Sequence, residues 1–541
     1  MQIDRSIMKK RSITWLATLT LMGGMFATIL TGCSSSDSDK SGDNPSVEAE
    51  SVAAADESIL KLAAGAETYW EASTPEAQGV DSALLTQMYE DIESSKLDVH
   101  HVLILKNGFK VSEANYYPYA ATDLHILNSV TKSFTSALIG KAIDEKLIES
   151  VDQPVMDFFT SRTIANPSEF KDSMKLKDLL TMTSGIDWVE TGNYGASTDS
   201  NTQMWQSDNQ IQFMLDKVVT KEPGSTFYYC SGGTHLMSGI LREVTGQSEE
   251  VYATEKLFTP LGIENYTWGQ DNQGNNSGSS RLFLSASDLA KFGELYRNKG
   301  KWNGEQLIPE AWVDASTQKL YDTPNGPSSQ SGYGYQWWMN PFGGYSARGF
   351  GGQFLYVVPD LDLVVVFMGS MGSTFFAPDR LMTEYVLPSV NGDAPLPENK
   401  VAQEALSAMQ QKVLEAPEAT ETPALNDAAK GMSGRIFTVE NGDKIGVDFV
   451  EGSSEATLHW TTDGETYDVP VGLDGIYRFS PCSGFYLKGY TSNVGFTGKW
   501  TTDRTFIITV CPTDGDATYT LALTYDKGTL KSTFRSNLTG R

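Results

Sequence analysis

The 541-residue sequence is poor in cysteine and histidine, with four and five of each. The histidines form no His-Glu-x-x-His pattern and the cysteines have no metal-site spacing, so we expect no metal and no other cofactor. No Gly-x-Ser-x-Gly occurs, which leaves an α/β-hydrolase active site without support. Basic residues are also in deficit, because 41 lysines and arginines face 68 acids, for a net charge of -27. A surface this acidic repels phosphate backbones, so nucleic acid is not an expected partner.

One long apolar run lies at the N-terminus. A basic cluster at residues 9–11 precedes the apolar residues 13–30, and the run ends in Leu-Thr-Gly-Cys33. Residues 1–33 are therefore predicted to be a secretory signal, and the last four resemble a bacterial lipobox, whose cysteine is acylated and becomes the new N-terminus. By the same resemblance to Gram-negative lipoproteins, Ser34 favours a lipid anchor in the outer membrane, facing the periplasm or the cell surface. A transmembrane anchor or an ordinary signal peptide is the alternative.

Composition divides the remaining chain into four segments. Residues 34–66 begin with small and acidic residues that cannot bury a core, and they are predicted to be a disordered tether. Residues 67–392 hold the main domain. Prolines bracket a linker, residues 393–431, in which residues 401–416 can form a helix. Residues 432–541 alternate polar and apolar positions between turn signals, which predicts a small all-β domain.

The main domain is expected to be α+β. An Asn107-Gly108 turn between apolar runs predicts a hairpin, and the apolar spacing of residues 129–147 predicts a helix. Strand signals return at residues 334–338 and 354–369. Because strands come early and late with helices between them, we expect one sheet built from both ends of the domain.

Five Ser-x-x-Lys tetrapeptides compete as a catalytic centre, and only the third heads an apolar helix. Residues three apart share a helix face, so its serine hydroxyl and lysine amine can meet. A serine attacks a carbonyl only when a base takes its proton, and a lysine is that base only when desolvation or nearby positive charge lowers its pKa. The alternative is a helix-capping serine with its lysine extended to solvent. The tetrapeptides begin at Ser6, Ser58, Ser129, Ser168 and Ser316.

Several ordered motifs favour the catalytic interpretation of Ser129 and Lys132. They resemble the serine β-lactamase and penicillin-recognising superfamily, and most closely its esterase and 6-aminohexanoate-dimer hydrolase branch. The resemblance covers roughly residues 75–390 and implies a β-lactamase/transpeptidase-like domain with an antiparallel sheet and a helical subdomain. The motifs are NSVTKSFTSALIG (128–140), LLTMTSGIDW (179–188), PGSTFYYCSGG (223–233) and SARGFGGQFLYVVPDLDLVVV (346–366), supported by SASDLAKFGELYRNKGKW (285–302) and YGYQWW (333–338).

The resemblance implies a role for each matching residue. Ser129 would attack a carbonyl to form an acyl-enzyme, with Lys132 as its base. Tyr229 would relay a proton to the leaving group, and Tyr228 is the rival for that role. The backbone N–H groups of Ser129 and Phe350 would form the oxyanion hole.

Other motif positions depart from the family pattern. Ser231 replaces a frequent Asn, and its hydroxyl could bond to Lys132 or to a substrate amide. The third motif, usually Lys-Thr-Gly or a histidine variant, is Ala347-Arg348-Gly349. Arg348 is a candidate for the missing charge, and Gly349 would let the substrate lie close to the strand.

Tryptophan and cysteine also occur in or near these motifs. Trp188 is expected either to wall the pocket or to pack in the core. Cys230 has no histidine placed beside it, so it is treated as a bystander. In an oxidising compartment Cys482 and Cys511 could form a disulfide, although the sequence alone does not establish the pair.

The sequence therefore predicts a serine hydrolase that cleaves esters or small amides. The first alternative is a β-lactamase, or a peptidoglycan peptidase or transpeptidase, on the same fold. The second is a non-catalytic binding lipoprotein that works through its C-terminal β domain. The expected partners are a small-molecule substrate and, through the N-terminal lipid, a membrane; the partner of the β domain and the oligomeric state are left open.

Overall fold

The structure is a computed structural model that describes residues 69–323, 332–392, 394–422, 424–462, 464–484 and 490–538. The predicted signal, Cys33 and the tether lie outside these residues. Within the described part of the chain, no helix is long and apolar enough to cross a membrane. The described residues all belong to one compact unit, residues 62–541.

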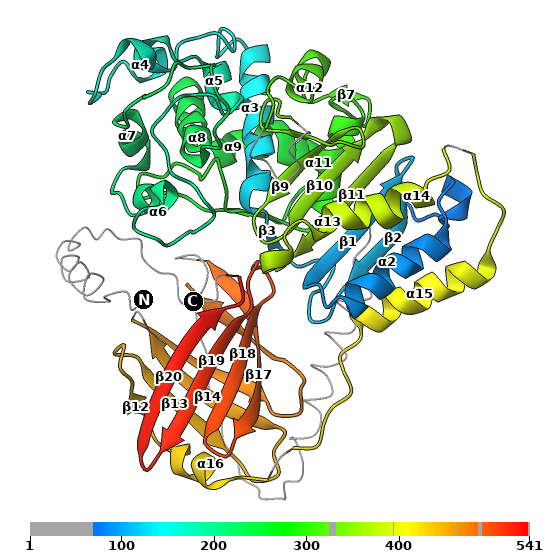
Figure 1. Ribbon diagram of the computed structural model, residues 1–541, viewed down its shortest axis with the longest axis vertical. Helices are drawn as coiled ribbons and strands as arrows, with labels where there is room; N and C mark the ends of the chain where they lie inside the picture. Colours follow the sequence, from blue (N-terminus) through cyan, green and yellow to red (C-terminus); the bar gives the residue numbers. More distant parts are fainter. Residues whose placement is uncertain are drawn as a thin grey trace, which may run out of the picture. The chain divides into compact units, whose positions relative to one another are not determined.

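A six-stranded antiparallel sheet forms the centre of the main domain (Figure 1), in the order β2-β1-β11-β10-β9-β8. The predicted hairpin is present, and Asn107 and Gly108 both adopt the positive φ that its turn requires. Leu103 of β1 pairs with Val366 of β11, so the sheet joins both ends of the domain, as expected. The strands are β1 (Val99–Lys106), β2 (Phe109–Asn115), β8 (Trp338–Met339), β9 (Tyr345–Gly349), β10 (Gln353–Val358) and β11 (Leu363–Gly369).

Two strand predictions change in detail. The signal at residues 334–338 yields only the short β8, which begins at Trp338. The signal at residues 354–369 splits into β10 and β11 around a 3₁₀ turn, Pro359–Leu361. Proline fixes its own φ and lacks an N–H, so it turns the chain back instead of extending the ladder.

Helices cover both faces of this sheet. Leu103 and Leu105 of β1 belong to one apolar core, and Val102 and Ile104 belong to the other. Because both faces are buried, the central strands are almost continuously apolar. Helices α3 (Thr131–Asp144) and α11 (Ala286–Arg297) contribute to the first core; α2 (Ser82–Ser94), α14 (Leu387–Ser389) and α15 (Lys400–Leu414) lie on the other face.

The helix expected inside the linker is α15, and it packs against the sheet. Leu406, Met409 and Val413, three and four residues apart, lie in the core beneath α2. This helix is therefore held on the main domain.

A helical region between β3 and β4 provides the expected helical subdomain. It buries Leu179, Ile211 and Leu236 together with α3. The helices are α4 (Glu169–Ser173), α5 (Leu176–Leu180), α6 (Ser200–Trp205), α7 (Gln210–Leu215), α8 (Ser231–Thr245), α9 (Glu249–Ala253) and α10 (Thr259–Leu261). Smaller elements are β3 (His125–Ile126), β4 (Thr267–Trp268), β5 (Leu282–Leu284), β6 (Lys301–Trp302), β7 (Glu305–Gln306), α12 (Glu310–Ser316) and α13 (Ala377–Leu381).

The C-terminal region is all-β, as predicted. After the short α16 (Asp427–Met432), nine strands form one curved sheet whose first and last strands approach each other. Residues 505–510 alternate between partly exposed and buried side chains, which is the period-two pattern of the sequence. The strands are β12 (Phe437–Thr438), β13 (Lys444–Phe449), β14 (Glu455–Thr462), β15 (Glu465–Gly472), β16 (Arg478–Ser483), β17 (Thr491–Thr502), β18 (Thr505–Pro512), β19 (Tyr519–Asp526) and β20 (Thr529–Ser536).

The suggested disulfide between Cys482 and Cys511 is absent from the structure, and the prediction is wrong. Both residues are buried free thiols. Cys482 lies on β16 and Cys511 on β18, and β17 runs between these two strands. Strands two positions apart in a sheet are separated by about 9–10 Å, which exceeds the span of a disulfide.

Candidate active site

A 3₁₀ turn, Asn128–Val130, places Ser129 immediately before α3. Lys132 lies on the first turn of α3, and its Nζ donates to Ser129 Oγ at 2.8 Å and to the carbonyl of Ser279 at 2.9 Å. Only 2% of Lys132 is exposed, so its amine does not extend to solvent. Nor does a side chain cap the start of α3. The structure therefore has the serine–lysine contact that catalysis needs, and not the helix-cap arrangement.

Burial changes the protonation of this lysine. Desolvation lowers the pKa of Lys132 to about 8, although the negative charge of Glu190 works in the opposite direction. At neutral pH a useful fraction of the amine is consequently neutral and able to accept a proton. Burial also raises the pKa of the Cys230 thiol to about 12, so this neighbour stays protonated and a poor nucleophile.

Tyr229, and not Tyr228, faces the lysine. The Nζ of Lys132 lies 5.0 Å from the centroid of the Tyr229 ring, which stacks on Trp338. Tyr228 is 40% exposed and lies under Lys221 instead. Burial and then Glu190 raise the pKa of Tyr229, which keeps the phenol protonated. Tyr229 is thus placed to donate a proton, and its environment opposes the anionic form.

Ser129 opens into a cavity of about 310 Å³. Eight of the eleven side chains around it are aromatic, and its charged residues are Glu190 and Arg348. Such a wall favours apolar groups and gives little to hold an anion. The lining residues are Ser129, Glu190, Tyr194, Phe227, Tyr228, Tyr229, Trp338, Arg348, Phe350, Phe375 and Phe376.

A hydrogen bond joins the serine turn to the end of β9. The side-chain Nδ2 of Asn128 donates to the carbonyl of Phe350 at 2.7 Å. Ser129 and Phe350, the two residues expected to form the oxyanion hole, both line the cavity. Their backbone N–H groups as that hole remain a prediction.

Ser231 bonds to Glu190, and not to Lys132 as suggested from the sequence. Its hydroxyl donates to Glu190 Oε1 at 2.7 Å, and its backbone N–H donates to Oε2 of the same carboxylate at 2.9 Å. Trp188 is buried and also donates to Glu190, from Nε1 at 2.7 Å. Both residues therefore hold Glu190 in place, and neither lines the cavity.

The third motif also acts differently from expectation. Arg348 reaches the cavity wall, but its guanidinium donates to Asp379 and Asn340, both at 3.1 Å. A Cβ on Gly349 would lie 2.3 Å from the carbonyl of Leu127. Glycine is required here because β9 lies against the backbone that leads to Ser129. The role of Gly349 in letting a substrate lie close to the strand stays a prediction.

Glu190 and Tyr194 were missed by the sequence reasoning. Both come from the irregular segment between α5 and α6, where no periodicity or motif spacing marks a residue. The Tyr194 hydroxyl donates to Glu190 at 3.2 Å, and its ring contacts Phe350 edge-on. The only signal in the sequence is that Glu190 follows Trp188 by two positions.

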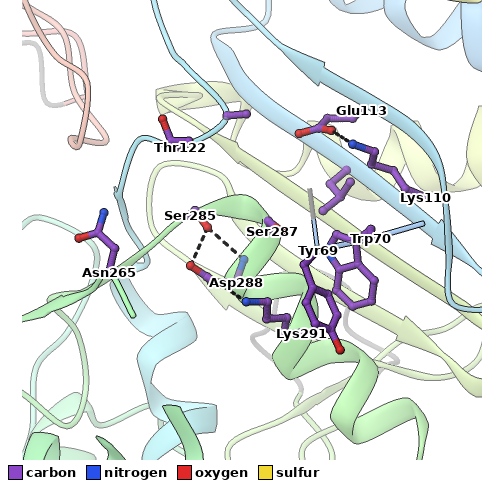
Figure 2. A pocket seen from close by; sticks show the side chains of 12 residues that line it. Tyr69, Trp70, Lys110, Glu113, Thr122, Asn265, Ser285, Ser287, Asp288 and Lys291 are labelled. Atoms are coloured by element: carbon purple, nitrogen blue, oxygen red, sulfur yellow. Dashed lines mark hydrogen bonds and ion pairs between the residues drawn. The ribbon is translucent and has the colours of Figure 1, made fainter. Parts of the chain in front are cut away.

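A second cavity, of about 250 Å³, lies elsewhere on the main domain (Figure 2). Its charged residues are engaged with one another, in the pairs Lys110–Glu113 and Lys291–Asp288. Tyr69 lies over Lys291. No serine–lysine contact occurs among the residues that line it. Within the described residues, no group of three or more His, Cys, Asp or Glu side chains is arranged to hold a metal.

Comparison with known proteins identifies relatives of the main domain. Residues 100–381 match the family model described as Beta-lactamase. The chain is 27% identical over 285 residues to a 6-aminohexanoate-dimer hydrolase from Paenarthrobacter ureafaciens, across 50% of this chain and 71% of that protein. It is 23% identical over 287 residues to penicillin-binding protein 4 from Amycolatopsis lactamdurans, across 46% of this chain and 73% of that protein.

Solved structures of similar fold are also known. An octameric penicillin-binding protein homologue from Pyrococcus abyssi is 18% identical, with a TM-score of 0.48, and the match covers 84% of this chain and 98% of that one. All residues that line the larger cavity fall inside the family match.

Proposed function

Since the chain belongs to the beta-lactamase family and has the fold of its serine hydrolases, we propose that it cleaves short esters or small amides through an acyl intermediate on Ser129. One observation carries the proposal. The desolvated amine of Lys132 lies 2.8 Å from Ser129 Oγ at the edge of an aromatic cavity. This is the contact a serine needs in order to lose its proton as it attacks.

The proposed reaction assigns each proton a route. Neutral Lys132 accepts the hydroxyl proton while Ser129 Oγ bonds to the carbonyl carbon of the substrate. The resulting oxyanion is stabilised by backbone N–H donors at Ser129 and Phe350. As the bond to the leaving group breaks, Tyr229 gives that group a proton and regains one from the Lys132 ammonium. Water then attacks the acyl carbon and gives a proton to Lys132. The bond between the acyl carbon and Ser129 Oγ breaks, Lys132 returns the proton to Oγ, and the acid is released.

The cavity supports neutral or cationic substrates with a compact apolar acyl group. The carboxylate of Glu190 repels anions, and the charge of Arg348 is already engaged by Asp379. We therefore expect kcat/KM for p-nitrophenyl butyrate to exceed that for the p-nitrophenyl hemiester of succinate by at least about tenfold, because like charges in a binding site cost several kcal/mol. Equal rates for the two esters would contradict this account of the cavity.

The nucleophile is tested with a matched pair of serines. Ser168 heads the same tetrapeptide as Ser129, but its hydroxyl caps α4 by accepting from the Lys171 N–H. Ser129→Ala should abolish turnover of p-nitrophenyl butyrate, whereas Ser168→Ala should cost about 1 kcal/mol of stability and leave turnover intact. If Ser129→Ala hydrolyses the ester as fast as the unaltered protein, the proposal fails.

The β-lactam alternative remains a second candidate because a penicillin-binding protein is among the relatives. Two features weigh against it: Ala347 stands where the family motif has its lysine, and Arg348 is paired. Labelling of the protein by a fluorescent penicillin, with loss of the label in Ser129→Ala, would establish it in place of the ester reaction.

We also propose that the protein is a lipoprotein of the outer membrane. The support is the lipobox-like Leu-Thr-Gly-Cys33 and the following Ser34. Metabolic labelling with an alkyne-tagged fatty acid should mark the protein, and Cys33→Ala should remove the mark.

A further inference from the structure

A loop of the C-terminal β domain contacts the segment that leads to Ser129. Residues 513–518 connect β18 to β19. Within this loop Thr513, Asp514, Asp516 and Ala517 are all at least 94% buried. The carbonyl of Asp514 accepts from the backbone N–H of Ile126 at 2.9 Å, just before the serine turn. The loop is therefore fixed to the segment that carries Ser129.

Asp516 contacts both Asn128 and the turn that follows Phe350. Its Oδ2 accepts from Asn128 Nδ2 at 2.6 Å. A Cβ on Gly351 would lie 3.1 Å from the Cβ of Asp516, so the aspartate also packs against the turn that follows Phe350. Asp516 thus touches both the residue before Ser129 and the turn after Phe350.

The contact completes the hydrogen bonding of Asn128. A side-chain amide has two N–H donors, and here one serves the carbonyl of Phe350 and the other serves Asp516. Asn128 also has a φ of +46°, a left-handed conformation that persists only where surrounding contacts hold it. Removing Asp516 would leave one amide N–H without this acceptor and release one support of the residue before the nucleophile.

We propose that Asp516 is a positioning residue, which acts through Asn128 to align Ser129 with the backbone donor of Phe350. This inference rests on the proposed acyl-transfer function. It gives the C-terminal β domain a part in the active site of its own chain. Asp516 touches no reacting atom, so its effect should fall on kcat and on the reactivity of Ser129 more than on KM.

The test compares three variants of the full chain. Asp516→Ala should lower kcat, and the saturating rate at which a fluorophosphonate labels Ser129, by on the order of ten- to a hundredfold, since small misplacements of reacting groups have effects of this size. Asp516→Asn keeps an oxygen that accepts from Asn128, and it should retain most of both rates. Tyr117→Phe is the control, because it removes another bond to the β domain, in which Tyr117 Oη accepts from the Tyr477 N–H at 3.0 Å.

The outcomes separate this inference from the function on which it rests. If the unaltered protein neither takes the label nor cleaves esters, the proposed function fails. If it does both and Asp516→Ala is equally fast, the positioning role alone is overturned. An equal loss in Asp516→Ala and Tyr117→Phe, with lowered melting temperatures in both, would also overturn it, because general loosening of the β domain would then explain the effect.

Discussion

The protonation of Lys132 predicts how the reaction depends on pH. Burial lowers the pKa of this amine to about 8, and only the neutral form can take the proton of Ser129. At pH 6, two units below that pKa, about one amine in a hundred is neutral, so kcat/KM should be about a hundredfold below its plateau. The rate should rise tenfold per pH unit up to pH 7, and level off above pH 9.

Substitution of Glu190 should shift this pH profile in a direction that the structure predicts. Its negative charge favours the ammonium form and raises the pKa of Lys132, against the effect of burial. Glu190→Gln removes the charge and keeps the shape, so the rising limb of kcat/KM should move to lower pH. The assay is hydrolysis of p-nitrophenyl butyrate from pH 5 to pH 10, with substrate well below KM so that the free enzyme is reported. A limb that stays in place or moves upward, or a flat profile in the unaltered protein, would refute Lys132 as the base.

Three substitutions test neighbouring residues. Tyr229→Phe should slow turnover by about a hundredfold because it removes the proton relay, whereas Tyr228→Phe should leave kcat within about twofold; comparable losses would reject the assignment. Gly349→Ala should lower the free energy of unfolding by about 2 kcal/mol, since its methyl group would meet the carbonyl of Leu127 at 2.3 Å, and denaturant melts measure the change. Cys230→Ala should leave turnover unchanged, and a loss of turnover with native stability would give this thiol a role.

Much of the fold could be predicted because local patterns and global packing agree. Asn and Gly tolerate the positive φ that a tight hairpin turn requires, and the hairpin turns at Asn107 and Gly108 as predicted. The alternation in residues 505–510 matched a sheet with one buried face. At residues 354–369 the apolar pattern alone did not show the turn, because the residues on both sides of Pro359 all suit strands.

The site could be predicted only where the chemistry is local in sequence. Ser129 and Lys132 are three residues apart, so the 3₁₀ turn and the first turn of α3 bring them together. The contacts of Glu190, Arg348 and Asp516 join residues that lie far apart in the sequence. No spacing rule reveals that Ser231 faces Glu190, or that Asp379 engages Arg348. Those partners are set by tertiary packing, which a single sequence does not display.

The most direct test is the reaction of a fluorophosphonate with the soluble protein that lacks residues 1–33, followed by intact-mass and peptide mass spectrometry. Activation of Ser129 by Lys132 predicts a single adduct on Ser129, which forms faster as the pH rises from 6 to 9. A folded protein that takes no adduct, or takes one on another serine, would contradict the serine hydrolase account.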